Sequence, residues 1–254
     1  MGWTWLPRIE KGGDMQSSID YMEESLLALF DQYKEMYSPL EARYKGEACF
    51  AEYGRGGTIL HRGFYCPSPI IDIVIGGSDR GRLIKNTKNM TSYDYVFHRT
   101  KDGRLIIVDQ YWFEREGYNP YRREFLIERE NQIIAPIFEK TCANHQLVYL
   151  SLCEYDTLGR IVSYRTMLPG YRMVRNIAEF DIQKCSYYAE DYTYAKETGW
   201  IASVHNGKMM DGLASETSYC FYHDDDGTLT AFQSTCSELN NKIYTVPKSK
   251  QRKV

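Results

Sequence analysis

The amino-acid sequence predicts a mainly β fold of the α+β class, an antiparallel β-meander of successive hairpins with an N-terminal helical segment. Before residue 46, apolar residues recur every three or four positions, as on one face of a helix. After residue 46, Tyr, Val, Ile, Phe and Trp occur in short runs between Gly, Asn and Asp turns, as in strands joined by hairpins. The connections between these runs are short, which favours antiparallel pairing of sequence neighbours.

The helical segment is predicted to occupy residues 1–46 and to pack on the sheet. Apolar residues from Ile19 to Phe30 lie at helical spacing, with charged residues on the opposite side. A second helix is predicted to begin at Ser38, because Ser at the N-cap and Glu41 three residues later form a capping box. Two consecutive helices are therefore expected before the first strand.

The β-meander is predicted to occupy residues 47–244. Its hairpin turns carry Gly103, Gly159, Gly199 and Gly227 at equivalent places, and glycine permits the left-handed backbone that such turns need. The predicted strands, in chain order, are residues 48–53, 58–65, 70–75, 93–99, 104–113, 124–129, 133–138, 147–155, 160–167, 187–196, 200–205, 218–223 and 228–235.

The last segment, residues 245–254, is predicted to be a basic flexible tail. It carries Lys248, Lys250, Arg252 and Lys253 and has few apolar residues to bury. The whole chain has 31 Lys and Arg residues against 34 Asp and Glu residues, which gives a formal net charge of −3. This balance argues against a nucleic-acid partner.

Cysteine spacing and hydropathy predict a cytoplasmic protein with no membrane partner. The 7 cysteines lack the paired spacing of a zinc site or a disulfide framework, so reduced thiols are expected. No stretch approaches the ~18 apolar residues of a membrane-spanning helix, and the N-terminus has no signal-peptide pattern. The Gly-rich residues 54–57 lie between predicted strands rather than before a helix, so neither a phosphate-binding loop nor a cofactor is expected.

One hairpin resembles a known repeat motif. The residues Tyr155, Asp156, Gly159, Arg160 and Ile161 match the pattern of the YD-repeat family, and residues 93–105 and 222–229 share fragments of it. In that family, long arrays of such hairpins build β shells in secreted or surface proteins, often around toxins. The resemblance implies β-hairpins at these places, and no functional residue is carried over from it.

Two segments contain residue types that could support catalysis. Ser78 follows a predicted buried strand, as in a nucleophile elbow, although Arg80 stands where that turn needs glycine. Cys142 and His145 lie three residues apart, and an imidazole can activate a thiol. Histidines in the predicted strands stand alone, so no metal site is expected. A hydrolase or transferase with a thiol or carboxylate site assembled across the sheet is the alternative function.

The most suggestive feature is the number of tyrosines, which is 22. Strand alternation places tyrosines of residues 187–194 on one face, with Glu190 among them, and a second pair shares a face of residues 147–155. Tyr and Trp are favoured at recognition surfaces because they offer a large rigid area and one polar tip. The predicted partner-binding residues are Tyr188, Tyr192, Tyr194, Tyr149, Tyr155 and Trp112.

The sequence thus favours a non-catalytic cytosolic protein-binding module whose partner is another protein. The more specific hypothesis is an immunity-type bacterial protein that neutralises a toxin, by analogy with the setting of YD repeats. A third hypothesis is a structural or carbohydrate-contacting β protein. It predicts a shallow groove lined by Tyr and Trp.

Overall fold

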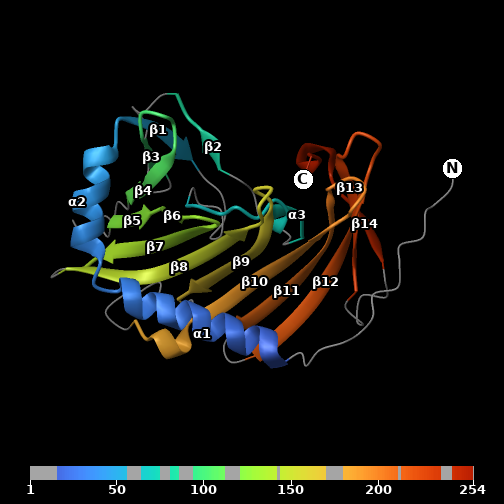
Figure 1. Cartoon of the computed structure of the whole chain (residues 1–254), viewed down its shortest axis with the longest axis horizontal. Helices are drawn as coiled ribbons and strands as arrows, with labels where there is room; N and C mark the ends of the chain where they lie inside the picture. The colour runs from blue at the N-terminus through green and yellow to red at the C-terminus, as the bar shows by residue number, and fades with distance from the viewer. Residues whose placement is uncertain are drawn as a thin grey trace.

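The computed structural model describes residues 16–55, 64–74, 81–85, 94–111, 121–141, 144–169, 180–210, 213–235 and 242–253. This part of the chain forms one long curved sheet with helices lying against it (Figure 1). The helical elements are α1 (Gln16–Tyr33), α2 (Tyr37–Glu47), α3 (Ile71–Val74) and the 3-10 turns η3 (Ile182–Lys184) and η5 (Lys248–Lys250). The strands are β1 (Phe50–Arg55), β2 (Arg82–Leu83), β3 (Asp94–Arg99), β4 (Leu105–Tyr111), β5 (Tyr121–Phe125), β6 (Ile127–Arg129), β7 (Gln132–Lys140), β8 (His145–Tyr155), β9 (Ile161–Leu168), β10 (Ser186–Tyr194), β11 (Ile201–Met210), β12 (Leu213–His223), β13 (Leu229–Ser234) and β14 (Ile243–Thr245).

The strands lie across the sheet almost in chain order. The order is β14-β13-β12-β11-β10-β9-β8-β7-β5-β4-β3-β1-β2, and β6 pairs with β7 beside this path. Neighbours in the described strands pair antiparallel, as in the central pairs β8–β9 and β10–β11. The predicted mainly β fold and its meander order are therefore confirmed.

The hairpin glycines adopt the backbone conformation that their turns require. Gly103, Gly159, Gly199 and Gly227 have φ values of 89°, 75°, 71° and 80°. The turns at Gly103, Gly159 and Gly227 are each closed by the same pair of backbone hydrogen bonds, 2.9–3.0 Å long. Residues with a Cβ are disfavoured in this left-handed region, so glycine defines these turns. The predicted hairpins around all four glycines are confirmed.

A buried strand is predicted at residues 70–75. Residue 75 lies outside the described residues, and the strand assignment is wrong for residues 71–74. The chain forms the short helix α3 here, although Ile70 and Ile71 are fully buried as expected. The Ser68 hydroxyl oxygen accepts hydrogen bonds from the backbone N–H groups of Ile70 and Ile71, at 3.4 and 3.1 Å. This local cap turns the backbone into a helix despite its β-branched residues.

The region before β3 also differs from the predicted pairing. A hairpin is predicted between residues 48–53 and 58–65, but β1 pairs with β3 and β2, and residues 64 and 65 are not in a strand. Residues 58–63 lie outside the described residues. The prediction that Ser38 caps the second helix is also wrong, because α2 already begins at Tyr37 and no side-chain hydrogen bond caps its first turn.

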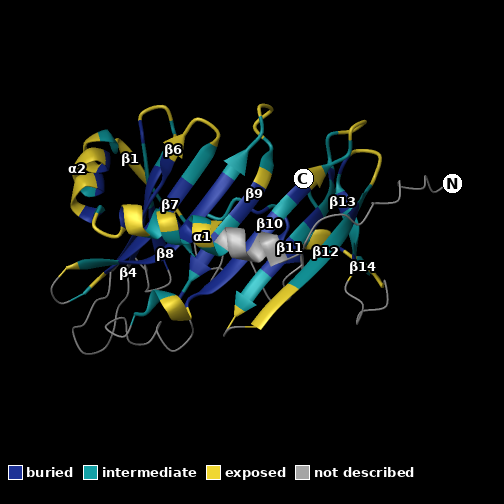
Figure 2. Cartoon of the chain, turned by 60° about the horizontal axis from the view of Figure 1, so that its bottom comes forward, coloured by how far each residue is buried: buried dark blue, intermediate teal, exposed yellow. Residues whose placement is uncertain are grey.

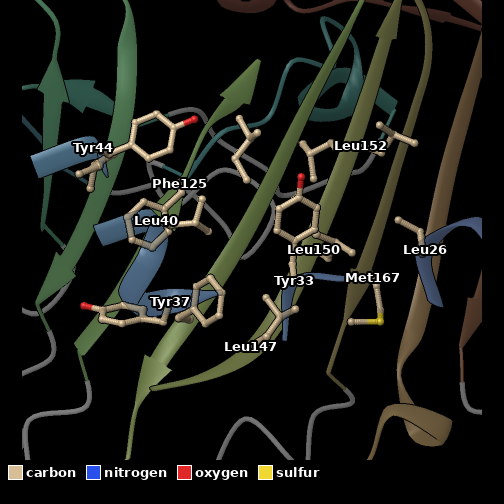
Figure 3. Close-up of a cluster of buried hydrophobic side chains, with 14 of the residues drawn as sticks. Leu26, Tyr33, Tyr37, Leu40, Tyr44, Phe125, Leu147, Leu150, Leu152 and Met167 are labelled. Carbon is tan, nitrogen blue, oxygen red and sulfur yellow. The ribbon is translucent and has the colours of Figure 1, made fainter. Parts of the chain in front are cut away.

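Helices α1 and α2 pack on one side of the sheet, called the helix face below. Their apolar side chains meet those of the central strands in a large buried cluster (Figure 3). Phe125 and Phe138 are fully buried there, and the Tyr37 ring meets both edge-on, with centroids 5.8 and 5.4 Å away. Apolar packing of the helical segment on the sheet therefore forms one of the two main cores.

Residues 64–74, called the cover segment below, lie over the opposite side of the sheet, the cover face. Successive side chains of β10 point to opposite sides of the sheet. Tyr187 therefore belongs to the buried cluster beneath α1, whereas Tyr188 and Tyr192 pack with Ile70 in a second buried cluster. In Figure 1, α1 runs along the lower side of the central strands and α3 lies above them. The sheet is thus packed on both faces by different kinds of structure.

The C-terminal segment is described through residue 253 and is bound to the molecule, so the prediction of a flexible tail is wrong. Val246 is fully buried, and its backbone N–H donates to the carbonyl oxygen of Thr230. Arg252 forms an ion pair with Asp72 of α3. The sequence pattern misses this because it shows the basic charge but not the buried carboxylate that neutralises it.

Candidate functional site

The predicted partner-binding tyrosines of β10 share a face, as alternation requires, but that face is covered. Tyr188 and Tyr192 are only 4% and 8% exposed and pack beneath the cover segment. Tyr194 is partly buried, its hydroxyl donates to the Ile161 carbonyl oxygen at 2.8 Å, and Arg160 lies over its ring. In the described structure these phenol groups are therefore engaged inside the protein.

The other predicted partner-binding residues are engaged in a similar way. Tyr149 is 8% exposed and Arg122 lies over its ring, 5.3 Å from the centroid. The hydroxyl oxygens of Tyr155 and Tyr65 are 2.6 Å apart, so Tyr155 binds the cover segment. Trp112 lies outside the described residues.

A buried carboxyl group organises the tyrosines of β10. Glu190 is fully buried, and Tyr188 and Tyr192 each donate a hydrogen bond of 2.5 Å to one of its two oxygens. The Ser68 side chain of the cover segment also hydrogen-bonds to Glu190. Burial raises the pKa of Glu190, while these donors act against that rise. We call Glu190, Tyr188, Tyr192 and Ser68 the acid–phenol cluster.

A second buried carboxyl group also contacts the cover segment. Glu124 accepts a hydrogen bond from the backbone N–H of Tyr65 at 2.7 Å, and burial raises its pKa to about 8. The thiol of Cys153 lies between the side chains of Tyr65 and Tyr155, and burial raises its pKa to about 11. A thiol in this state is a weak nucleophile, so the cover face holds the groups of a sealed core.

The helix face offers a more accessible set of polar groups. Register pairing brings Glu154, Ser163, Asp191, His205 and Ser218 into one continuous row across β8, β9, β10, β11 and β12. Apart from the buried Ser163, these residues are partly exposed, and Figure 2 shows intermediate and exposed residues along β11 and β12. We call this row, together with Arg165 and Glu216, the polar patch.

Arg165 connects the carboxylates of the polar patch. One terminal nitrogen lies 3.1 Å from Glu154 Oε2 and 2.5 Å from Ser163 Oγ, and the other lies 3.1 Å from Asp191 Oδ1. Burial raises the pKa of Asp191, and the positive charge of Arg165 acts against this rise. The guanidinium therefore holds two carboxylates of neighbouring strands in a fixed arrangement.

His205 connects the other end of the polar patch. Its Nδ1 is 3.0 Å from Ser218 Oγ, and its Nε2 is 3.6 Å from Glu216 Oε2. His205 also faces Asp191 directly across the β10–β11 pair. The patch thus presents carboxylate, imidazole, hydroxyl and guanidinium groups side by side, which suits recognition of a polar surface by hydrogen bonds and charge.

The remaining catalytic candidates do not come together in the described part of the chain. Ser78 and Cys142 lie outside it, and the His145 ring stacks on Tyr37 with centroids 3.6 Å apart. Within the described residues, no group of His, Cys, Asp and Glu is arranged to hold a metal ion. No described helix has the length and apolar character that crossing a membrane requires.

We find no match to this chain among models of protein families, among curated proteins or among solved structures. The geometry of the described residues is therefore the basis for a functional proposal.

Proposed function

We propose that this protein is a protein-binding module that contacts its partner through the polar patch. The main support for this proposal is the continuous row of residues from Glu154 to Ser218. The row spans five neighbouring strands, and its charged side chains are partly exposed to solvent. Strands of one sheet hold such groups with little freedom. Preordered groups lose less conformational entropy when a partner binds.

The composition of the patch supports recognition through charge. Glu154, Asp191 and Glu216 contribute carboxylates, while Arg165 is only 12% exposed and already engaged by two of them. Complementary charge mainly sets partner choice and association rate. A role as an immunity-type protein that binds a toxin in the bacterial cytoplasm is the finer form of this proposal, and its support is the resemblance of residues 154–161 to the YD-repeat motif.

The test compares two matched charge reversals. Asp191→Lys places a cation beside Arg165 in the patch, whereas Glu52→Lys changes another partly exposed carboxylate, which pairs with Arg99 on β3 far along the sheet. Tagged wild-type protein is used to recover a stoichiometric partner from native cells, and the affinity of each variant for it is then measured. We expect at least about tenfold weaker binding for Asp191→Lys and unchanged binding for Glu52→Lys. Equal affinities for the two variants would contradict the proposed interface.

A specific contact favours a second candidate function, a hydrolase that uses Ser218 as nucleophile. The imidazole of His205 lies within hydrogen-bond reach of Ser218 Oγ and faces Glu216 on its other side. Such an enzyme would turn over generic ester substrates, and Ser218→Ala would abolish this activity. Measurable turnover that disappears in Ser218→Ala, with no stoichiometric partner recovered, would replace the binding proposal with this one.

A further inference from the structure

A polar contact joins the C-terminal end of the described chain to α3, 180 positions earlier in the sequence. Arg252 donates to Asp72 Oδ1 at 2.5 Å and to Oδ2 at 3.0 Å, and it also donates to the Pro69 carbonyl oxygen. Lys250 Nζ donates to the backbone carbonyl oxygen of Asp72 at 2.7 Å. In Figure 1 the C-terminus lies next to α3. Residues 246–253, called the strap below, therefore hold the cover segment from outside.

The strap is bound mainly by polar contacts. Val246 is its only buried apolar residue, and backbone hydrogen bonds join the strap to β13 at Thr230 and Leu229. The Arg252 side chain is 29% exposed, so dissolved ions can reach it. An attachment of this kind is weakened by salt, in contrast to the apolar attachment of α1.

Asp72 makes the cover segment sensitive to the strap. Its side chain is only 5% exposed, so its negative charge has little access to water while α3 lies on the sheet. A buried carboxylate that loses its cation must gain water or another proton. Displacement of Arg252 therefore favours outward movement of α3, which would hydrate Asp72.

The cover segment in turn seals the groups beneath it. Ser68 hydrogen-bonds to Glu190, and the Tyr65 side chain contacts the fully buried thiol of Cys153. Movement of this segment exposes the acid–phenol cluster and the Cys153 thiol to solvent.

We propose that the strap is an electrostatic clamp, and that its release from Asp72 opens the cover segment and exposes the acid–phenol cluster. The clamp acts through the charge of Asp72, because that charge is what makes the closed state unfavourable once Arg252 has left. Removal of the charge should therefore keep the cover segment closed even when the strap is detached.

The experiment measures the rate at which a small alkylating reagent modifies each cysteine, with mass spectrometry of the peptides. Cys153 reports on the cover face, the exposed Cys49 controls for reagent activity, and the buried Cys185 on the helix face reports global unfolding. In Arg252→Gln we expect at least about tenfold faster modification of Cys153, with unchanged rates for Cys49 and Cys185. Lys248→Gln, which removes a neighbouring charge of the strap, should leave all three rates unchanged.

The double variant Asp72→Asn with Arg252→Gln distinguishes the proposed clamp from a general loss of contacts between the strap and the cover segment. Modification of Cys153 should return to within about twofold of the wild-type rate, because no buried charge then drives α3 outward. In the wild type, ~1 M salt should accelerate Cys153 modification, since the screening length falls to about 3 Å. The proposal is overturned if Cys153 is unchanged in Arg252→Gln, if the double variant stays fast, or if Cys185 accelerates equally.

Discussion

The two faces of the sheet are packed by different combinations of apolar and polar contacts. On the helix face, α1 and α2 bury a continuous apolar cluster that includes Leu26, Phe125 and Phe138. On the cover face, the cover segment also buries apolar residues, but hydrogen bonds to Glu124 and Glu190 and the ion pair of Asp72 hold it in place. Apolar packing is insensitive to pH and little affected by moderate salt, whereas buried charges respond to both. The comparison indicates that the attachment of the cover segment responds to pH and salt more strongly than the apolar attachment of α1.

A buried ion network on the helix face lies under α2. Arg123 donates to both oxygens of the buried Asp109, at 2.7 and 2.9 Å, and to Glu41 of α2 at 2.6 Å. His98 Nε2 lies 2.9 Å from Asp109 as well. This network pairs Asp109 directly with a cation, whereas the tyrosine and serine groups that hydrogen-bond to Glu124 and Glu190 are uncharged donors. Lys208 places a positive charge near Glu190.

The largest expected effect is the loss of an aromatic ring from the helix face. Phe125→Ala removes a fully buried ring that packs against Tyr37 and Phe138. We expect it to lower the free energy of unfolding by about 3–5 kcal/mol, by the same amount at pH 5 and pH 8. Chemical denaturation at both pH values measures this. A loss that differs strongly between the two pH values would contradict the apolar character of this face.

The second prediction concerns the pH dependence that Glu124 gives to the cover face. Burial raises the pKa of Glu124 from 4.5 to about 8 in the folded protein. Above pH 4.5 the unfolded chain has lost this proton while the folded protein keeps it, so the folded state is favoured less as pH rises. We expect the free energy of unfolding to fall by about 3–4 kcal/mol between pH 5 and pH 8 from this group.

The matched variant is Glu124→Gln, which keeps an oxygen to accept the Tyr65 N–H but cannot ionise. Its free energy of unfolding should change less between pH 5 and pH 8 than that of the wild type, by the amount given above. Identical pH profiles for the two proteins would show that Glu124 does not retain its proton in the folded state.

A neighbouring pair of tyrosines gives the third prediction. The Tyr188 hydroxyl donates to Glu190 on the cover face, whereas the buried Tyr187 hydroxyl on the helix face has no hydrogen-bond partner among the described residues. Tyr188→Phe should cost about 1–2 kcal/mol of unfolding free energy, and Tyr187→Phe should be neutral or stabilising. Thermal or urea unfolding of both variants tests this, and equal losses would contradict the different roles of the two hydroxyls.

The strand order could be predicted from the sequence because it depends on local information. Gly103, Gly159, Gly199 and Gly227 mark turns whose left-handed backbone favours glycine, and short turns force neighbouring strands to pair. The segment at residues 70–75 could not be assigned in this way. Its run of apolar, β-branched residues is typical of a buried strand as well as of a buried helix. In the structure, the Ser68 side chain caps the segment and favours the helix.

The candidate site could be predicted only in part. Alternation correctly groups Tyr188, Tyr192 and Glu190 on one face, but it cannot reveal that the cover segment lies on that face. The contact between His205 and Ser218 depends on the register of β11 against β12, and each residue alone gives no signal. The ion pair of Arg252 with Asp72 joins residues 180 positions apart, beyond any local pattern.

The last prediction concerns a small loss of stability at Asp191, the residue next to Glu190 that lies on the helix face. The side chain of Asp191 is 43% exposed, and its ion pair with Arg165 has a distance of 3.1 Å. Partly exposed pairs of this kind contribute about 0–1 kcal/mol, so Asp191→Asn should change the free energy of unfolding by less than about 1 kcal/mol. The same substitution removes a charge from the polar patch and should weaken partner binding measurably. A large loss of stability in Asp191→Asn would mean that the polar patch is part of the protein core. It would also contradict the inference that Glu190 lies on a sealed face of β10 and Asp191 on an accessible one.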